Sequence, residues 1–309
     1  MSSRHPAARA AALAARLVDR AAWYSGGIAE RSRLAVRTTL ARAGLPVTRE
    51  YLELGCASGN EASGLFSEFT AVLGCLHHYQ QHRDIYSGMR VNFGGEGLYY
   101  DASRGGNWWE YFFEPVSLGD ATEGRRRQVP LWQHDAFAEG VEASIPRKDA
   151  AAVIYNHVRP RRVVLDGVDR LVTTQFTGAH VIGVHYRGTD KYEESTPVGL
   201  PRIIDAIQGV VPRSSQPWKL FIATDDQSAL DALMAAFPGR VVVADSERSS
   251  DGSPVHKRTG EGFRRGLEAC VDCFVLSRCA HLVRTSSNLG LVATYLNPAM
   301  PVTLVEAQS

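Results

Sequence analysis

Polar residues suited to phosphate binding or proton transfer follow three apolar segments of the chain, each where the segment ends. They are His185, Arg187, Asp190 and Lys191; then Thr224, Asp225 and Asp226; then Thr285, Ser286, Ser287 and Asn288. An arginine fork and a hydroxyl-rich turn that opens a helix both suit phosphate oxygens, and a carboxylate can accept a proton. Each cluster alone also fits a solvated loop or a helix N-cap. Convergence of all three would therefore be the specific indication of a site.

The elements around these clusters predict the sheet that positions them. The apolar run beginning at Val181 predicts a buried strand. Further strands are predicted at Trp218–Ala223, Arg240–Ala244, His281–Arg284 and Val302–Val305, and helices at 201–210, Ser228–Phe237, Glu261–Arg278 and Leu289–Leu296. Strict alternation of strand and helix is typical of a doubly wound parallel sheet, in which ligands bind off the carboxyl ends of the strands. We therefore expect the three clusters to share one edge.

Two sequence features raise the question of a metal. The Asp225-Asp226 pair directly precedes a predicted helix, so N-capping is the favoured role for one of the two carboxylates. The Cys270-x-x-Cys273 pair, followed by Cys279 and His281, falls inside a predicted helix, where cysteine packs as a small apolar residue. No metal is expected.

A second glycine-containing turn lies in residues 51–60, which read Tyr-Leu-Glu-Leu-Gly-Cys-Ala-Ser-Gly-Asn. A strand, a turn with Gly59 and Asn60, and a helical pattern after it together suit an anion. The stretch resembles the first motif of methyltransferases that use S-adenosylmethionine, but residues 88–93 offer no acidic residue to hold the ribose. The alternative is a loop that a sugar or a pyrophosphate approaches.

Aromatic and basic residues mark two further segments. Seven aromatic residues, which can stack on sugars or fill a core, lie between residues 94 and 116: Tyr99, Tyr100, Trp108, Trp109, Tyr111, Phe112 and Phe113. Most are expected in the core, with one or two beside a cleft. Residues 1–48 are rich in alanine and arginine, which favours a basic helix packed loosely on the body. Such a helix also suits weak contact with a membrane surface.

The composition narrows the class of protein. The chain has 309 residues, 44% hydrophobic and 22% charged, with a formal net charge of +1. These values fit a soluble protein of about two domains and give no reason to expect nucleic acid. No apolar run approaches the roughly 20 residues that span a bilayer. Five cysteines do not form a disulfide framework, so a reducing, cytoplasmic location is expected.

Residues 178–298 resemble the α-1,6-fucosyltransferases and the rhizobial nodulation fucosyltransferases, which use GDP-fucose. The matching motifs are His185-Tyr-Arg187-Gly-Thr-Asp190-Lys191, Ala223-Thr-Asp225-Asp226, Leu267 through Asp272 to Leu276-Ser277, and Thr285-Ser-Ser-Asn288. The resemblance implies a GT-B fold, with two Rossmann-like domains whose parallel sheets face an interdomain cleft. It also implies an inverting, metal-independent mechanism without a cofactor. The expected domains are a basic extension (1–48), an acceptor-side domain (49–177) and a nucleotide-sugar-binding domain (178–309).

The resemblance also implies roles for single residues. Arg187 matches the arginine that binds pyrophosphate, and Asp272 matches a carboxylate that reads the guanine edge, with His185 beside it. Ser286, Ser287 and Asn288 match the phosphate turn. The family's second arginine is Gly188 here, which removes one phosphate contact. The position of the family's base in strict register is Ser195; we favour Glu194 as base, then Glu193, then Asp190, with Lys191 orienting the carboxylate or neutralising phosphate.

The sequence thus predicts a glycosyltransferase that moves fucose, or a related sugar, from a GDP-sugar to a hydroxyl of a glycan or small molecule. Two alternatives stay open: a methyltransferase built on residues 51–60, and a non-catalytic relative that binds nucleotide sugars. We expect the acceptor to contact residues 49–177.

Overall fold

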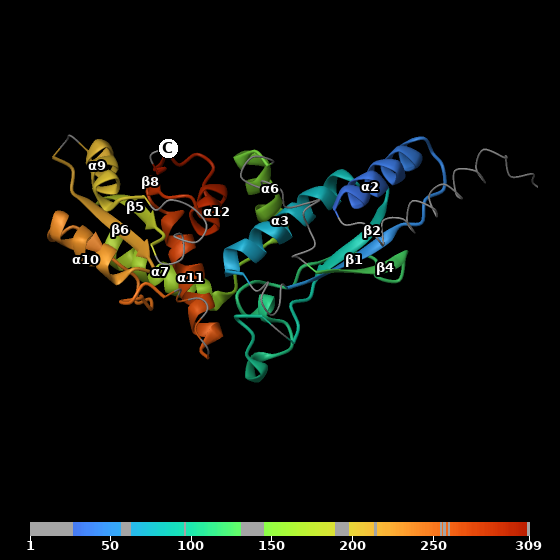
Figure 1. The fold of residues 1–309 in the computed structure, drawn as a ribbon, viewed down its shortest axis with the longest axis horizontal. Helices are drawn as coiled ribbons and strands as arrows, with labels where there is room; N and C mark the ends of the chain where they lie inside the picture. Colours follow the sequence, from blue (N-terminus) through green and yellow to red (C-terminus); the bar gives the residue numbers. More distant parts are fainter. Residues whose placement is uncertain are drawn as a thin grey trace, which may run out of the picture. The chain divides into compact units, whose positions relative to one another are not determined.

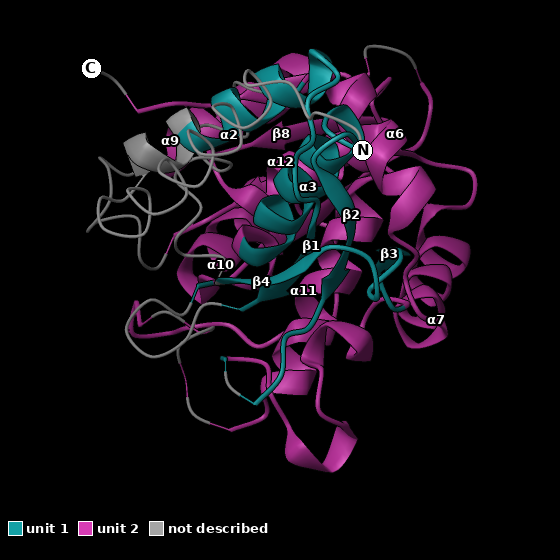
Figure 2. Ribbon diagram, turned by 90° about the vertical axis from the view of Figure 1, so that its right-hand side faces the viewer, with its two compact units in different colours: residues 1–63, 68–97, 115–145 teal, residues 64–67, 98–114, 146–309 magenta. Residues whose placement is uncertain are grey.

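The computed structural model describes residues 27–56, 63–95, 97–130, 145–188, 198–212, 215–253, 255, 258 and 260–307 (Figure 1). The chain divides into two compact units, coloured separately in Figure 2. Unit 1 comprises residues 1–63, 68–97 and 115–145, and unit 2 comprises residues 64–67, 98–114 and 146–309. The predicted domains divide the chain elsewhere, near residue 177, and those boundaries stay a prediction.

Unit 1 contains a four-stranded sheet in the order β3-β2-β1-β4. Strand β1 (Glu50–Gly55) pairs in parallel with both β2 (Tyr86–Val91) and β4 (Arg125–Pro130), and β3 (Ser117–Gly119) runs antiparallel to β2. Helix α3 (Leu65–Gln81) follows β1 and leads into β2. Five apolar residues of this helix are buried: Phe66, Phe69, Val72, Leu73 and Leu76. A parallel crossover of this kind is the Rossmann unit expected for residues 49–177.

Helix α2 (Gly27–Arg42) lies within the basic N-terminal segment. It is held more firmly than the sequence predicts, because Arg33 and Arg37 are buried against the carboxylate of Glu50 at the start of β1. The guanidinium nitrogens lie 2.9 Å and 3.4 Å from Glu50 Oε1. Buried charges persist only when they are paired in this way, so these arginines are structural. Residues 1–26 lie outside the described part of the chain.

Unit 2 is built on a five-stranded, all-parallel sheet in the order β7-β6-β5-β8-β9. Its strands are β5 (His180–Tyr186), β6 (Trp218–Thr224), β7 (Val241–Val242), β8 (His281–Arg284) and β9 (Val302–Leu304). The chain builds outward from β5 to β7, then crosses back to place β8 on the other side of β5. The switch point of a doubly wound sheet, where such folds bind ligands, therefore lies between β5 and β8.

Helices cover both faces of this sheet (Figure 1). Helices α9 (Leu200–Val210) and α10 (Gln227–Ala236) form one core with the sheet, in which Ile182, Ile207 and Leu233 are fully buried. Helices α11 (Gly262–Leu276), α12 (Asn288–Leu296), α6 (Arg147–His157) and α7 (Arg162–Leu171) lie on the other side. A Cβ atom at Gly183 would come within 3.0 Å of Leu276, so α11 packs directly on the backbone of β5.

Most predicted elements of unit 2 are confirmed. Pro160 lies between α6 and α7, since proline cannot continue a helix, and a single π turn extends α7 over Val172–Phe176. The strand predicted at Arg240–Ala244 is wrong in length, since β7 has two residues. Beyond it, the guanidinium of Arg248 donates to the carbonyls of Ala244 and Ser246, both at 3.0 Å, and the chain leaves the sheet.

The aromatic segment belongs to unit 2. Six of its seven members are buried, as expected: Tyr99, Trp108, Trp109, Tyr111, Phe112 and Phe113. Short 3₁₀ turns cover Ala102–Arg104 and Trp108–Tyr111. Phe112 stacks on Phe263 of α11 with ring centroids 5.6 Å apart and planes at 14°. Segment 98–114 is therefore part of the core beneath α11. None of the described helices is both long enough and apolar enough to cross a membrane.

Candidate functional site

The three polar clusters meet at the carboxyl edge of the unit 2 sheet, as the sequence predicts. The backbone N–H of Arg187, after β5, donates to Thr285 Oγ1 after β8 at 3.2 Å. On the other side, the N–H of Gly188 donates to Asp225 Oδ1 after β6, also at 3.2 Å. Because both bonds leave the same short segment, they fix the ends of three neighbouring strands to one another.

His185 lies at the centre of this edge and is buried. Its Nδ1 lies 3.1 Å from the carbonyl oxygen of Ala223, which only accepts, so Nδ1 carries the proton. Nε2 of the neutral ring then accepts from the hydroxyl of Ser287, 2.6 Å away. Burial lowers the pKa of His185 to about 4, which keeps the ring neutral. While both bonds are made, no ring nitrogen is left for a ligand.

Ser287 connects this histidine to helix α12, of which it is the N-cap. Its Oγ accepts from the N–H of Gly290 at 3.1 Å, while its O–H donates a hydrogen bond to Nε2 of His185. A side chain at 290 would be tightly packed, because a Cβ there would lie 3.0 Å from the His185 ring and 3.1 Å from Arg284 Cδ. Of the other members of the turn, Ser286 is exposed and Asn288 is half-buried, so both are accessible beside a helix N-terminus.

The acidic pair divides its roles. Asp226 caps α10 by accepting from the N–H groups of Ser228 at 2.8 Å and Ala229 at 3.1 Å, which confirms the predicted N-cap. Asp225 instead accepts from Gly188. A Cβ at Gly188 would lie 2.8 Å from Cβ of Asp226. The Asp226 side chain, which caps α10, therefore occupies the space that a side chain at 188 would need. A side chain at position 188 would therefore have to displace Asp226 in this structure.

Asp272 is a buried carboxylate on α11, 9% exposed. Its Oδ2 accepts a long, 3.4 Å hydrogen bond from Ser246, whereas its Oδ1 has no hydrogen-bond partner among the described residues. Burial raises the pKa of Asp272 to about 7; the charge of Glu268 adds to this shift and that of Arg248 opposes it. A buried carboxylate oxygen left without a donor is costly, so this oxygen is a candidate acceptor for a donor group of a ligand.

One residue of this edge, Arg284, does not follow from sequence reasoning. It is buried at the end of β8, and its Nη1 lies 3.5 Å from the carbonyl oxygens of Thr285 and of Ser287. The sequence does place an arginine as the last residue of an otherwise apolar strand. Charged residues are common where strands end, however, so this position alone does not indicate a buried charge. A charge so deep in a strand pattern requires a partner or a function.

Several predicted site residues lie outside the described part of the chain: Gly59, Asn60, Asp190, Lys191, Glu193 and Glu194. Their roles stay predictions. Among the described residues, no group of three or more His, Cys, Asp or Glu side chains is arranged to hold a metal ion. Cys270 and Cys273 are buried, and burial raises the pKa of both thiols, so they pack as apolar residues.

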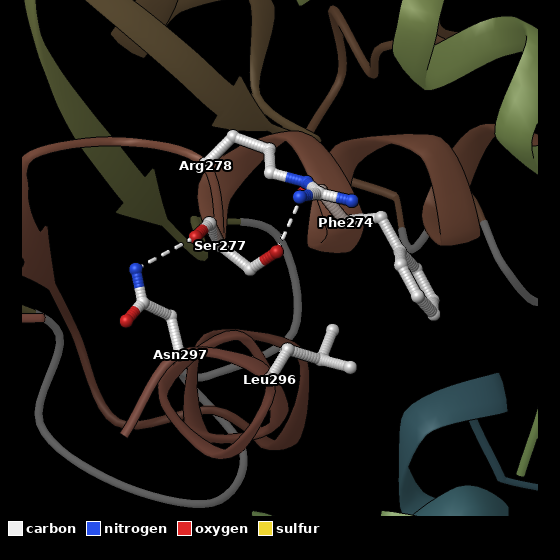
Figure 3. Close-up of a pocket in the computed structure, with 5 residues that line it drawn as sticks. All are labelled: Phe274, Ser277, Arg278, Leu296 and Asn297. Carbon is white, nitrogen blue, oxygen red and sulfur yellow. Dashed lines mark hydrogen bonds between the residues drawn. The ribbon is translucent and has the colours of Figure 1, made fainter. Parts of the chain in front are cut away.

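A cavity of about 350 Å³ lies elsewhere in unit 2, lined by Phe274, Ser277, Arg278, Leu296 and Asn297 (Figure 3). These residues lie at the carboxyl ends of α11 and α12, from which the chain enters the amino ends of β8 and β9. The cavity is therefore at the edge of the sheet opposite to His185. Within it, Asn297 donates to the carbonyl of Ser277 at 3.0 Å, and Ser277 donates to the carbonyl of Phe274 at 2.7 Å.

Comparison with known proteins shows which proteins this chain resembles in sequence and fold. Residues 144–295 match the family model of Nodulation protein Z (NodZ). Nodulation protein Z of Sinorhizobium fredii is 26% identical over 199 residues, which cover 58% of this chain and 61% of that protein. The chain thus spans less than two thirds of the length of this curated relative.

Solved structures agree in fold. Fucosyltransferase NodZ from Bradyrhizobium superposes with a TM-score of 0.57 and 18% identity, covering 81% of this chain and 94% of that one. A NodZ α-1,6-fucosyltransferase soaked with GDP-fucose gives a TM-score of 0.54 and 17% identity, with the same coverage. The resemblance to nodulation fucosyltransferases is thereby confirmed, and the chain has the GT-B fold of these NodZ proteins.

Proposed function

We propose that the protein is a glycosyltransferase that moves fucose, or a related sugar, from a GDP-sugar to a hydroxyl acceptor. The observation that carries this proposal is the convergence of the three strand-end clusters at the switch point between β5 and β8. The NodZ structure soaked with GDP-fucose supports the choice of donor. The edge combines an arginine, a hydroxyl turn and a helix N-terminus, which together suit a leaving diphosphate.

In this proposal Asp272 binds the base of the nucleotide. Guanine presents an N–H and an NH₂ group side by side, and one carboxylate can accept from both. The oxygen of Asp272 without a partner supplies the required acceptor, and the donors of guanine would remove the cost of its burial. Uracil has no such pair of donors, so this contact favours GDP over UDP.

The diphosphate is assigned to Arg187, Ser286 and Asn288, together with the N–H groups at the start of α12. Thr224 and Asp225 hold the strand ends beneath it through their bonds to Asp226 and Gly188. We assign His185 to positioning, because its two ring nitrogens are bonded to Ala223 and Ser287. It therefore fixes the turn that binds phosphate and does not read the base itself.

We propose an inverting, metal-independent transfer. It needs a base close to the acceptor hydroxyl, and cationic side chains that stabilise the negative charge of the leaving diphosphate. We propose Glu194 as the base, then Glu193, then Asp190, with Lys191 orienting the carboxylate. The acceptor, a glycan or a small molecule, is assigned to residues 49–177. All five cysteines are free thiols, which supports a reducing, cytoplasmic location.

One observation favours the alternative of a non-catalytic protein that binds nucleotide sugars. Gly188 lacks the side chain of the family's second arginine, and Asp226 occupies the space of a replacement, which suits a relative that binds a GDP-sugar without transferring it. The methyltransferase alternative does not gain support, since the position after β2 is Asn92, whose amide donates to Glu53 at 2.8 Å. An acidic residue that would hold the ribose is thus not present there.

Thermal unfolding with GDP, UDP and S-adenosylmethionine tests the ligand, because a ligand that binds the folded state raises its stability. We expect stabilisation by GDP alone. Mass spectrometry of reactions with GDP-fucose, GDP-mannose and an acceptor panel then tests transfer. Stabilisation by S-adenosylmethionine but not GDP would reject the proposal, and binding of GDP-fucose without hydrolysis or transfer would favour the non-catalytic alternative.

A further inference from the structure

We propose that Arg284 is the second cation of the diphosphate site, acting from beneath the turn at 285–288 in place of the arginine that the family has at position 188. Arg284 is a positioning residue in this inference: it orients the peptide groups of the turn and adds a positive charge behind them. The inference rests on the proposed function, because it assigns a role within the same nucleotide site.

The position of Arg284 follows from the register of the sheet. His185 of β5 and Arg284 of β8 are direct partners, so their side chains lie on the same face of adjacent strands. Both contact the first turn of α12 at Gly290, whose missing side chain leaves the space that they occupy. Arg284 is therefore buried directly below the residues assigned to phosphate.

The orientation of the turn follows from the geometry of the peptide bond. The carbonyl oxygens of Thr285 and Ser287 both lie 3.5 Å from Nη1 of Arg284. In a planar trans peptide the carbonyl and the next N–H point in opposite directions. The N–H groups of Ser286 and Asn288 therefore point away from Arg284, toward the exposed side of the turn. Two N–H groups directed to the same exposed side, next to a helix N-terminus, suit an anion.

The charge of Arg284 also acts through the low-dielectric interior. Burial lowers the pKa of His185 and of Arg147, and the charge of Arg284 adds to both shifts; Arg147 donates to the carbonyl of Met300. A buried charge is screened by salt much less than an exposed one. A positive potential that reaches these neighbours also reaches an anion on the far side of the turn.

Position 188 supplies no cation in this chain, because it is a glycine. Any side chain at 188 meets Asp226, which is fixed by its hydrogen bonds to the first turn of α10. The adjacent strand β8 supplies an arginine one strand away, at the same edge. Loss of one arginine and gain of another thus keep the number of cations at the diphosphate site.

The test compares binding of guanosine and GDP by titration calorimetry in wild type, Arg284→Gln and Arg284→Lys, with the exposed Arg278→Gln as a control for loss of charge. We expect Arg284→Gln to lose about tenfold or more in GDP affinity while guanosine affinity stays within about twofold, since only the phosphates face the turn. Arg284→Lys keeps the charge but loses the planar fork, so we expect about a threefold loss for GDP. Arg278→Gln should match wild type for both ligands.

Equal losses for guanosine and GDP in Arg284→Gln would overturn the inference, because they would indicate general damage to the site. Unchanged GDP affinity in that variant would overturn it as well. If Arg284→Gln does not fold, Arg284→Lys decides alone, and a wild-type ratio of GDP to guanosine affinity rejects the role. Failure of the wild-type protein to bind GDP would reject the proposed function and the inference together, whereas GDP binding that is insensitive to position 284 rejects only the inference.

Discussion

The hydroxyl of Ser287 lies 2.6 Å from Nε2 of His185, and this bond joins residues 102 positions apart in the chain. It ties the end of β5 to the N-cap of α12 across the switch point of the sheet. Because the same hydroxyl also accepts from Gly290, a single atom sets both the position of the imidazole and the start of the helix.

Removal of this hydroxyl tests its importance for the fold. Ser287→Ala leaves Nε2 of His185 buried without a donor and removes a helix cap, so we expect a loss of about 1–3 kcal/mol in the free energy of unfolding. Ser287→Thr keeps the hydroxyl and should recover most of the loss. Urea unfolding at neutral pH measures both, and an alanine variant as stable as wild type would contradict the assigned role.

Asp272 is expected to oppose stability in the absence of ligand. Its pKa is about 7 in the folded protein against an ordinary value of 3.8, so its stabilising effect is present at low pH and is lost as pH rises between these values. Asp272→Asn should therefore raise the free energy of unfolding at pH 8 by on the order of 1–3 kcal/mol and should abolish GDP binding. Exposed Asp205→Asn on α9 is the matched control. A destabilised Asp272→Asn protein would show that the carboxylate is structural.

Acid should destabilise unit 1 through His78. Burial, with a smaller contribution from the charge of His82, lowers the pKa of His78 to about 3. The unfolded chain binds a proton below about pH 6.5 while the folded state does not, so stability falls as pH decreases from there toward 3. At pH 5 the loss amounts to about 2 kcal/mol relative to pH 7. In His78→Gln the difference in unfolding free energy between pH 7 and pH 5 should shrink by a similar amount, and an unchanged difference would contradict the prediction.

Position 188 should not tolerate a side chain. Gly188→Ala brings a Cβ within 2.8 Å of Asp226 Cβ, and we expect a loss of about 1–3 kcal/mol from this overpacking. In an Asp226→Gly background the obstructing atoms are gone, so the same substitution should cost less. A double-mutant cycle measured by urea unfolding gives this coupling. Additive effects would mean that the contact does not determine the residue at 188.

Arg187 carries the most direct prediction for activity. Arg187→Ala should reduce sugar transfer at least about 100-fold while leaving the thermal unfolding midpoint within a few degrees of wild type, because its assigned role is electrostatic. Exposed Arg170→Ala on α7 is the control for loss of an arginine. Full activity of the Arg187 variant, measured by mass spectrometry of the product, would reject its role.

The sequence was informative where burial repeats with a clear period. The apolar pattern predicts the strand His281–Arg284 at its observed bounds, and helices α9, α10, α11 and α12 within a few residues of theirs. The meeting of Arg187, Asp225 and Thr285 followed from the parallel sheet alone. Hydrogen bonds and close contacts between particular side chains do not follow from the periodic pattern. Neither the protonation of His185 nor the space that Asp226 takes from position 188 leaves a periodic signal.

The role of Arg284 was missed for the same reason, since a strand pattern does not distinguish a charge that ends a strand from one buried beneath a turn. The firm anchoring of α2 depends on Arg33 and Arg37 meeting Glu50, a contact between segments that periodicity treats separately. The aromatic run at 98–114 was predicted as core, but its partner helix α11 follows more than 140 residues later.

That last arrangement limits how the molecule can be cut. A fragment that begins at 178 lacks the ring of Phe112 over Phe263, and it also lacks α7, whose Gly167 faces Val271. Such a fragment would contain all five strands of the unit 2 sheet, but the face of α11 that packs on Phe112 and Gly167 would be exposed to water. The sheet of unit 2 and its cover are therefore a discontinuous part of the chain, and a construction that joins two related chains at residue 178 would not keep them intact.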